Sequence, residues 1–196
     1  MAFSRIPDVF PVLRGDGLLL REMTEDDLPA WFARLSDPGG AALAGDPLAT
    51  SMQDVVDGLA YHRNAFRTKE ALRWAIVPES VGASVGSIGL VTLDEANLSG
   101  EIGTAIGRAH WGRGFATGAT RLVVDYAFGV LGIERIEAEA LAVNGRSARV
   151  LDKLGFTREG LLRGYRIVDG ARADFVVYGL LRRDWAGQKP PDGSTG

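Results

Sequence analysis

The chain has 196 residues, carries a formal net charge of −3 and is 46% hydrophobic, which suits one domain with a sizeable core and no internal repeat. This charge balance does not favour a nucleic-acid-binding surface, and the absence of cysteine excludes disulfides, thiolate metal ligands and a cysteine acyl-enzyme. Its histidines, His62 and His110, lie far apart without ligand spacing, so we predict no metal site. No apolar run approaches the ~18 residues of a membrane span, and no signal peptide is recognisable, so we expect a cytoplasmic protein without a membrane partner.

One domain is predicted, over residues 14–185. Residues 1–13 contain two prolines and are predicted to form a loosely held arm. Residues 186–196 are rich in proline, glycine and serine, which predicts a disordered tail.

The first half of the domain is predicted to contain one strand, two helices and then three antiparallel strands. A short first strand is predicted over residues 17–22, which read Gly-Leu-Leu-Leu-Arg-Glu. The pairs Thr24 with Asp27 and Ser51 with Asp54 resemble capping boxes, so each pair predicts the start of a helix. The three strands are expected over residues 73–77, 84–93 and 101–107.

The second half is predicted to begin with a helix and to end with a hairpin. The helix is indicated by an apolar stripe at Ala119, Leu122, Val123, Tyr126, Ala127 and Val130. A strand over 133–141, a short helix over 144–154 and a hairpin of strands 156–168 and 171–181 should follow. Its loop, Asp169–Gly170, suits a type I′ turn because both positions tolerate positive φ. The predicted fold class is therefore mixed α/β (α+β), with about seven strands and about four helices.

A glycine-containing loop stands between the strand at 101–107 and the long helix. Residues 110–117 read His-Trp-Gly-Arg-Gly-Phe-Ala-Thr. A strand, a glycine loop and a helix N-terminus together make an anion site, because the first-turn amides of a helix have no partner within it. The alternative is a plain turn that uses glycine for a tight bend. The loop is not a P-loop, and it matches the dinucleotide fingerprint weakly because Thr117 stands where that motif has Gly or Ala.

A second block follows further along the chain, where residues 144–156 read Asn-Gly-Arg-Ser-Ala-Arg-Val-Leu-Asp-Lys-Leu-Gly-Phe. Together the two blocks resemble the GNAT superfamily of acetyl-CoA-dependent N-acyltransferases. Within it they are most similar to the Rim-type branch, which acetylates the N-terminal amine of ribosomal proteins. The resemblance runs from about Arg14 to about Trp185. It implies the GNAT fold, with a V-shaped splay between the fourth and fifth predicted strands, in which the pantetheine arm completes the sheet.

The resemblance implies that acetyl-CoA is the co-substrate and that it binds along both blocks, with no metal. The implied binding residues are Ile106, Trp111, Gly112, Arg113, Gly114, Phe115, Ala116, Thr117 and Asn144. Other roles stay open at three of them: a core aromatic for Trp111, a solvent-facing charge for Arg113 and a helix cap for Asn144.

Acyl transfer to an amine requires a neutral amine, and the leaving thiolate benefits from a proton, so a general base and a general acid are expected. Glu101 matches the position where several GNAT members place the base. Many members use a tyrosine as the acid, but Leu151 occupies that position here. In the Rim-type branch a serine at the Ser147 position lies near the cofactor sulfur, so Ser147 is the candidate acid. The alternatives are an exposed strand-end carboxylate for Glu101 and a capping role for Ser147.

The leading hypothesis is an N-acetyltransferase that transfers an acetyl group directly to a primary amine of a small molecule or peptide, as a monomer or homodimer. A rival of another class is a non-catalytic acetyl-CoA sensor. A nucleotide-binding regulator is disfavoured by the antiparallel first half and the imperfect fingerprint. Residues 41–50 are assigned to no element; the Rim-type branch has a variable substrate-facing loop there, and its composition leaves the acceptor open.

Overall fold

The computed structural model describes residues 3–44, 48–168 and 170–186. The predicted tail lies outside these residues except for Ala186, and the predicted Asp169–Gly170 turn lies outside them at Asp169. The strands are β1 (Leu13–Gly15), β2 (Leu18–Glu22), β3 (Leu72–Pro78), β4 (Gly86–Asp94), β5 (Ser99–Ile106), β6 (Arg135–Leu141), β7 (Thr157–Val168) and β8 (Ala171–Leu181). The helices are α1 (Leu28–Leu35), α2 (Pro38–Ala44), α3 (Met52–Arg67), α4 (Phe115–Gly129), α5 (Gly145–Lys153) and α6 (Arg182–Ala186), with 3₁₀ turns η1 (Glu25–Asp27) and η2 (Arg108–His110).

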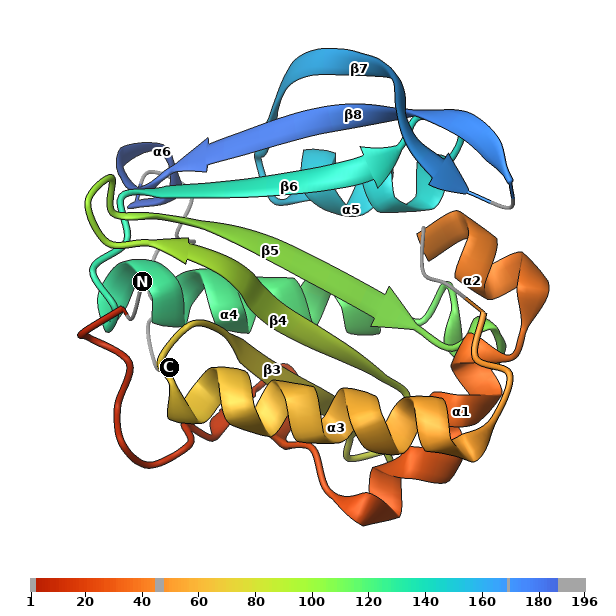
Figure 1. Ribbon diagram of the computed structural model, residues 1–196. Helices are drawn as coiled ribbons and strands as arrows, with labels where there is room; N and C mark the ends of the chain where they lie inside the picture. Colours follow the sequence, from red (N-terminus) through yellow and green to blue (C-terminus); the bar gives the residue numbers. More distant parts are fainter. Residues whose placement is uncertain (1–2, 45–47, 169, 187–196) are drawn as a thin grey trace, which may run out of the picture.

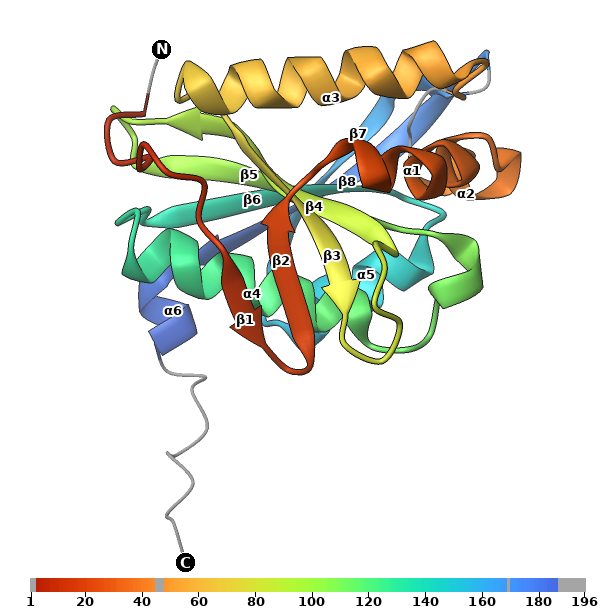
Figure 2. The same ribbon diagram turned by 90° about the horizontal axis from the view of Figure 1, so that it is seen from below.

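The strands form one mixed sheet in the order β1-β2-β3-β4-β5-β6-β8-β7, and helices cover both of its faces. Helices α1, α2 and α3 lie on one face, and α4, α5 and α6 lie on the other (Figure 2). All neighbouring strands are antiparallel except β5 and β6. The predicted mixed α/β class and the seven predicted strands are confirmed, and β1 is an eighth. No helix in the described part of the chain is long and apolar enough to cross a bilayer.

The parallel pair β5 and β6 separates along its length (Figure 1). Their pairing joins Ser99 to Arg135, Gly100 to Ile136 and Glu101 to Glu137, and ends there among the described residues. β5 stays paired with β4 up to Ile106, and β6 stays paired with β8. These strands are the fourth and fifth predicted from the sequence, so the expected splay is confirmed. We call this divergence the fork and the Glu101–Glu137 pair its vertex.

Local capping explains where the first helices begin. At α3, the Ser51 side chain and the Asp54 side chain form the predicted capping box. Thr24 and Asp27 form the other, but it opens η1, and α1 follows directly. The segment after α1 was assigned to no element, yet residues 38–44 form α2 at the open end of the fork (Figure 1). Its small residues give a weak periodic signal, and its placement depends on contacts with distant residues.

The prediction of a loosely held arm is wrong for residues 3–12. Phe3 and Ile6 are 0% and 1% exposed and belong to the main core. The indole Nε1 of Trp74 donates a 2.7 Å hydrogen bond to the carbonyl of Pro11. The prolines suggested an unstructured lead, but proline only restricts φ and does not prevent an extended segment from packing. The arm therefore covers one side of the core before the chain enters β1.

Candidate active site

A cavity of about 370 Å³ opens at the fork. This volume lies within the range of small-molecule sites, about 300–1,000 Å³. Its walls come from both sides of the sheet, which is possible because the strands no longer pair there. From α1 and α2 the lining residues are Arg34, Gly40, Leu43 and Ala44. From the opposite side they include Thr104 of β5, Thr117 and Thr120 of α4, and Ser147 and Leu151 of α5.

The glycine loop borders this cavity, and its backbone is shaped as an anion cradle. Gly112 and Gly114 have φ values of 77° and 83°, a left-handed conformation that favours glycine. A Cβ atom at either position would meet no atom within 4 Å, so open space lies beside the backbone. Gly114 is the N-cap of α4 and leaves its first-turn amides without a side-chain cap. An anion here would also gain about 0.3–1 kcal/mol from the helix dipole.

Trp111 and Arg113 of this loop have different surroundings. The Nε1 of Trp111 donates a 2.7 Å hydrogen bond to the carbonyl of Ile106, and its half-buried ring lines the cavity. Trp111 is therefore part of the cavity wall and not of the core. Arg113 is exposed, and its guanidinium lies 4.9 Å from the centre of the Phe115 ring. The carbonyl of Ile106, an implied cofactor contact, thus accepts from Trp111 and keeps a second lone pair.

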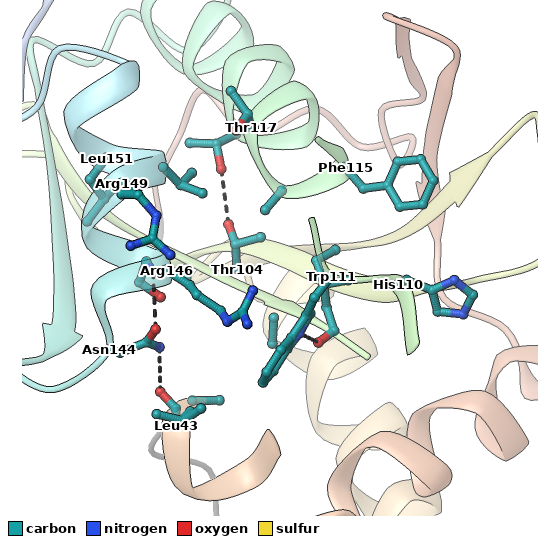
Figure 3. A pocket seen from close by; sticks show the side chains of 18 of the residues that line it. Leu43, Thr104, His110, Trp111, Phe115, Thr117, Asn144, Arg146, Arg149 and Leu151 are labelled. Atoms are coloured by element: carbon teal, nitrogen blue, oxygen red, sulfur yellow. Dashed lines mark hydrogen bonds between the residues drawn. The ribbon is translucent and has the colours of Figure 1, made fainter. Parts of the chain in front are cut away.

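Asn144 joins two elements at the cavity (Figure 3). Its Oδ1 accepts a 3.2 Å bond from the amide of Ser147, which caps α5. Its Nδ2 donates a 2.7 Å bond to the carbonyl of Leu43 at the end of α2. The capping role is therefore present, and the amide keeps a second N–H and a second oxygen lone pair with which it could also contact a ligand. Ser147 lines the cavity within the first turn of α5.

A basic stripe on α5 was missed by the sequence reasoning. Arg146, Arg149 and Lys153 all line the cavity. Figure 3 shows Arg146 beside Trp111, and its guanidinium is 4.9 Å from the ring centre. The spacing of three and four residues places these cations on one helix face, so the sequence contained the signal. They make this end of the cavity complementary to phosphate groups.

Glu101 lies at the vertex of the fork, on the face opposite α4. Its neighbours in β5 fix this orientation, because Ile102 is in the core and Thr104 bonds to Thr120 of α4. Thr92 Oγ1 donates to Glu101 Oε2 at 3.3 Å. Burial, and next the negative charge of Glu139, raise the pKa of Glu101 above its ordinary value, although Arg166 and Thr92 oppose the shift. Glu101 is half-buried and is not among the described residues that line the cavity.

Known proteins share this fold. A family profile described as "Acetyltransferase (GNAT) domain" matches residues 17–157. The chain belongs to the GNAT acetyltransferase family. This acetyltransferase is 33% identical over 174 residues to "Uncharacterized N-acetyltransferase YoaA" of Bacillus subtilis (strain 168), a match that covers 89% of this chain and 98% of YoaA.

Two further relatives of this GNAT acetyltransferase confirm the likeness to the Rim-type branch. The structure of Mycobacterium smegmatis RimJ in complex with CoA-disulfide has a TM-score of 0.80 and 27% identity, and the match covers 92% of this chain and 90% of RimJ. The "[Ribosomal protein uS5]-alanine N-acetyltransferase" of Escherichia coli (strain K12) is 33% identical over 84 residues, which is 43% of each chain. The N-acetyltransferase assignment is thus shown, and the acceptor is a separate question.

Proposed function

We propose that this enzyme transfers an acetyl group from acetyl-CoA directly to the primary amine of a peptide N-terminus or a small molecule, within a ternary complex. The fork is the observation that carries the proposal. An opening between two parallel strands leaves backbone polar groups without strand partners, and an extended amide-containing chain can satisfy them. The same opening lets a cavity reach both faces of the sheet, so donor and acceptor can approach from opposite sides.

The residues around the cavity fit acetyl-CoA in three respects. The cradle from Gly112 to Thr117 offers backbone amides to the pyrophosphate. The α5 stripe of Arg146, Arg149 and Lys153 supplies positive charge beside it. Between the cradle and the vertex, residues 102–106 of β5 are not paired with β6, which leaves that edge of the strand for the pantetheine arm. The thioester would then lie inside the fork, in the cavity that Ser147 and Thr104 also line.

Acetyl-CoA would supply the thioester carbonyl that the acceptor attacks. In our proposal Glu101 removes one proton from the acceptor ammonium, directly or through water, so that the nitrogen carries a free lone pair. The nitrogen forms a bond to the carbonyl carbon, and the carbon–sulfur bond breaks. Ser147 donates its proton to the leaving thiolate and recovers one from the acylated nitrogen through solvent. The products are an amide and a free thiol, and one proton remains on Glu101 for release.

A turnover screen tests this function. Purified enzyme is mixed with acetyl-CoA and a panel of amines: alaninamide, alanine-initiated peptides, free lysine and spermidine. Thiol release and the acetylated product are both measured. We expect amine-dependent thiol release with at least one member. The sensor alternative predicts acetyl-CoA binding by calorimetry without thiol release for any amine, and that result would refute the proposal.

Binding of acetyl-CoA should depend on the backbone of the glycine loop. We expect Gly114→Val to weaken it at least 10-fold, because a β-branched residue disfavours the positive φ that shapes the cradle. Gly82→Val is the matched control: Gly82 also has positive φ and open space at Cβ, but it lies outside the cavity. Calorimetry on both folded variants makes the comparison. Equal affinity in the two would remove the loop from the site.

A further inference from the structure

The cavity contains a carboxylate that the sequence reasoning did not assign. Among the described lining residues, Glu139 of β6 is the one acidic side chain, while several are cationic. It points to the same face as Glu101, because the alternate β6 residues Ile136, Ala138 and Ala140 belong to the core. Its side chain is 16% exposed. A carboxylate thus lies past the vertex on the sheet face opposite α4, which we call the acceptor side because the proposed base Glu101 is on the same face.

An irregular strand brings a partner to this carboxylate. The pairing of β7 with β8 shifts register between Leu162 and Arg166, and Gly164 within this bulge has a φ of 56°. Side chains of β8 hold the bulge: Asp174 accepts a 2.6 Å bond from the amide of Gly164, and Arg172 donates a 2.7 Å bond to its carbonyl. Bulges beside functional sites commonly re-aim a side chain.

The side chain that follows the bulge is Arg166, which pairs with Glu139. Its guanidinium lies 5.1 Å and 5.0 Å from the ring centres of Tyr165 and Phe175, so three groups fix its position. Both partners are far apart in sequence, and Glu139 is mostly buried. The pair therefore joins a 47% exposed Arg166 side chain to a mostly buried carboxylate, and the two aromatic rings hold the guanidinium beside it.

We propose that Glu139, held by Arg166, accepts a hydrogen bond from the acceptor nitrogen and thereby selects and orients the amine. This inference rests on the proposed function and adds a residue to its acceptor side. Glu139 and Glu101 have separate roles in this proposal. Arg166 balances the charge of Glu139, which binds and orients the nitrogen, while Glu101 takes the proton. Acceptors with a carboxylate beside the amine are disfavoured, because that group would approach Glu139.

The charges around the two carboxylates agree with this division. The charged groups that face Glu101 are Glu137 and Glu139 of β6 and Arg166 of β7, with the hydroxyl of Thr92 from β4. Glu139 raises the pKa of Glu101 more than Glu137 does. Removing the Glu139 charge should therefore also shift the activity of Glu101 to lower pH.

The test measures acetylation of the best acceptor from the screen by three variants. Glu139→Gln should raise KM for the amine about 10-fold or more, which is the loss of a charge-assisted hydrogen bond, with kcat affected less. The rising limb of its pH–rate profile should move to lower pH. Glu139→Asp keeps the charge and should restore the wild-type pH limb. The preference for alaninamide over alanine should shrink in Glu139→Gln.

Glu137→Gln is the control, because Glu137 is on the same strand and face but outside the cavity, paired with Arg135. It should leave KM near the wild-type value. If Glu139→Gln matches wild type, or matches Glu137→Gln in both KM and pH profile, this inference is wrong while the acetyltransferase proposal stands. If wild-type enzyme binds acetyl-CoA but acetylates no amine, the proposed function fails and this inference fails with it.

Discussion

Glu101→Gln is expected to lower turnover by about 100-fold or more on the best acceptor, because general-base catalysis contributes about 10²–10⁴-fold. Gln keeps the shape of the side chain and can still accept from Thr92 Oγ1. Acetyl-CoA affinity should stay unchanged, since the cradle and the basic stripe line the cavity and Glu101 does not. Steady-state kinetics and calorimetry on the same preparations separate the two effects.

The pH dependence of the rate is a second test of whether Glu101 is the general base. A base must be deprotonated to act, so the wild-type rate should rise as pH passes upward through the raised pKa of Glu101. The Gln variant should lose this limb. The variant should not melt earlier than wild type, because a raised pKa means that the fold disfavours the ionised carboxylate. Wild-type turnover and an unaltered pH profile in Glu101→Gln would show that another group is the base.

Phe3→Ala is expected to destabilise the protein by about 3–5 kcal/mol, the usual cost of removing a buried phenylalanine. Phe3 is 0% exposed and packs in the main core, and its amide donates a 2.7 Å bond to the carbonyl of Lys69. For a chain of this size, about 1 kcal/mol corresponds to about 2–4 °C in Tm, so thermal unfolding should shift by roughly 10 °C. Urea unfolding would measure the free-energy difference directly.

Val9→Ala is the matched control within the same arm, because Val9 is 81% exposed. A surface substitution of this kind usually changes stability by less than about 0.5 kcal/mol. If both variants unfold with the wild-type midpoint, residues 3–12 do not pack against the core in solution.

Several features of the site could be predicted from the sequence because they depend on residues close together in the chain. The capping box of Ser51 and Asp54 joins residues three apart, and the left-handed backbone at Gly112 and Gly114 favours residues without Cβ. The basic stripe of α5 was also within reach, since helical spacing alone puts Arg146 and Arg149 on one face. The splay of the strands was inferred from family resemblance, and the pairing of β5 with β6 confirms it.

Other features were decided only by the tertiary structure, because they join residues that no local pattern connects. The sequence allows Asn144 either a helix-capping or a cofactor-binding role. Its bond to Leu43 depends on α2 reaching the end of the fork. Glu139 reads as one of several alternating charges in its strand, and its place in the cavity follows from where β5 leaves β6. The sequence by itself determined local backbone shapes and the order of the seven predicted strands, but not the short elements β1 and α2. The long-range packing of strands and helices decided which side chains share the cavity, because those contacts form only when distant segments meet.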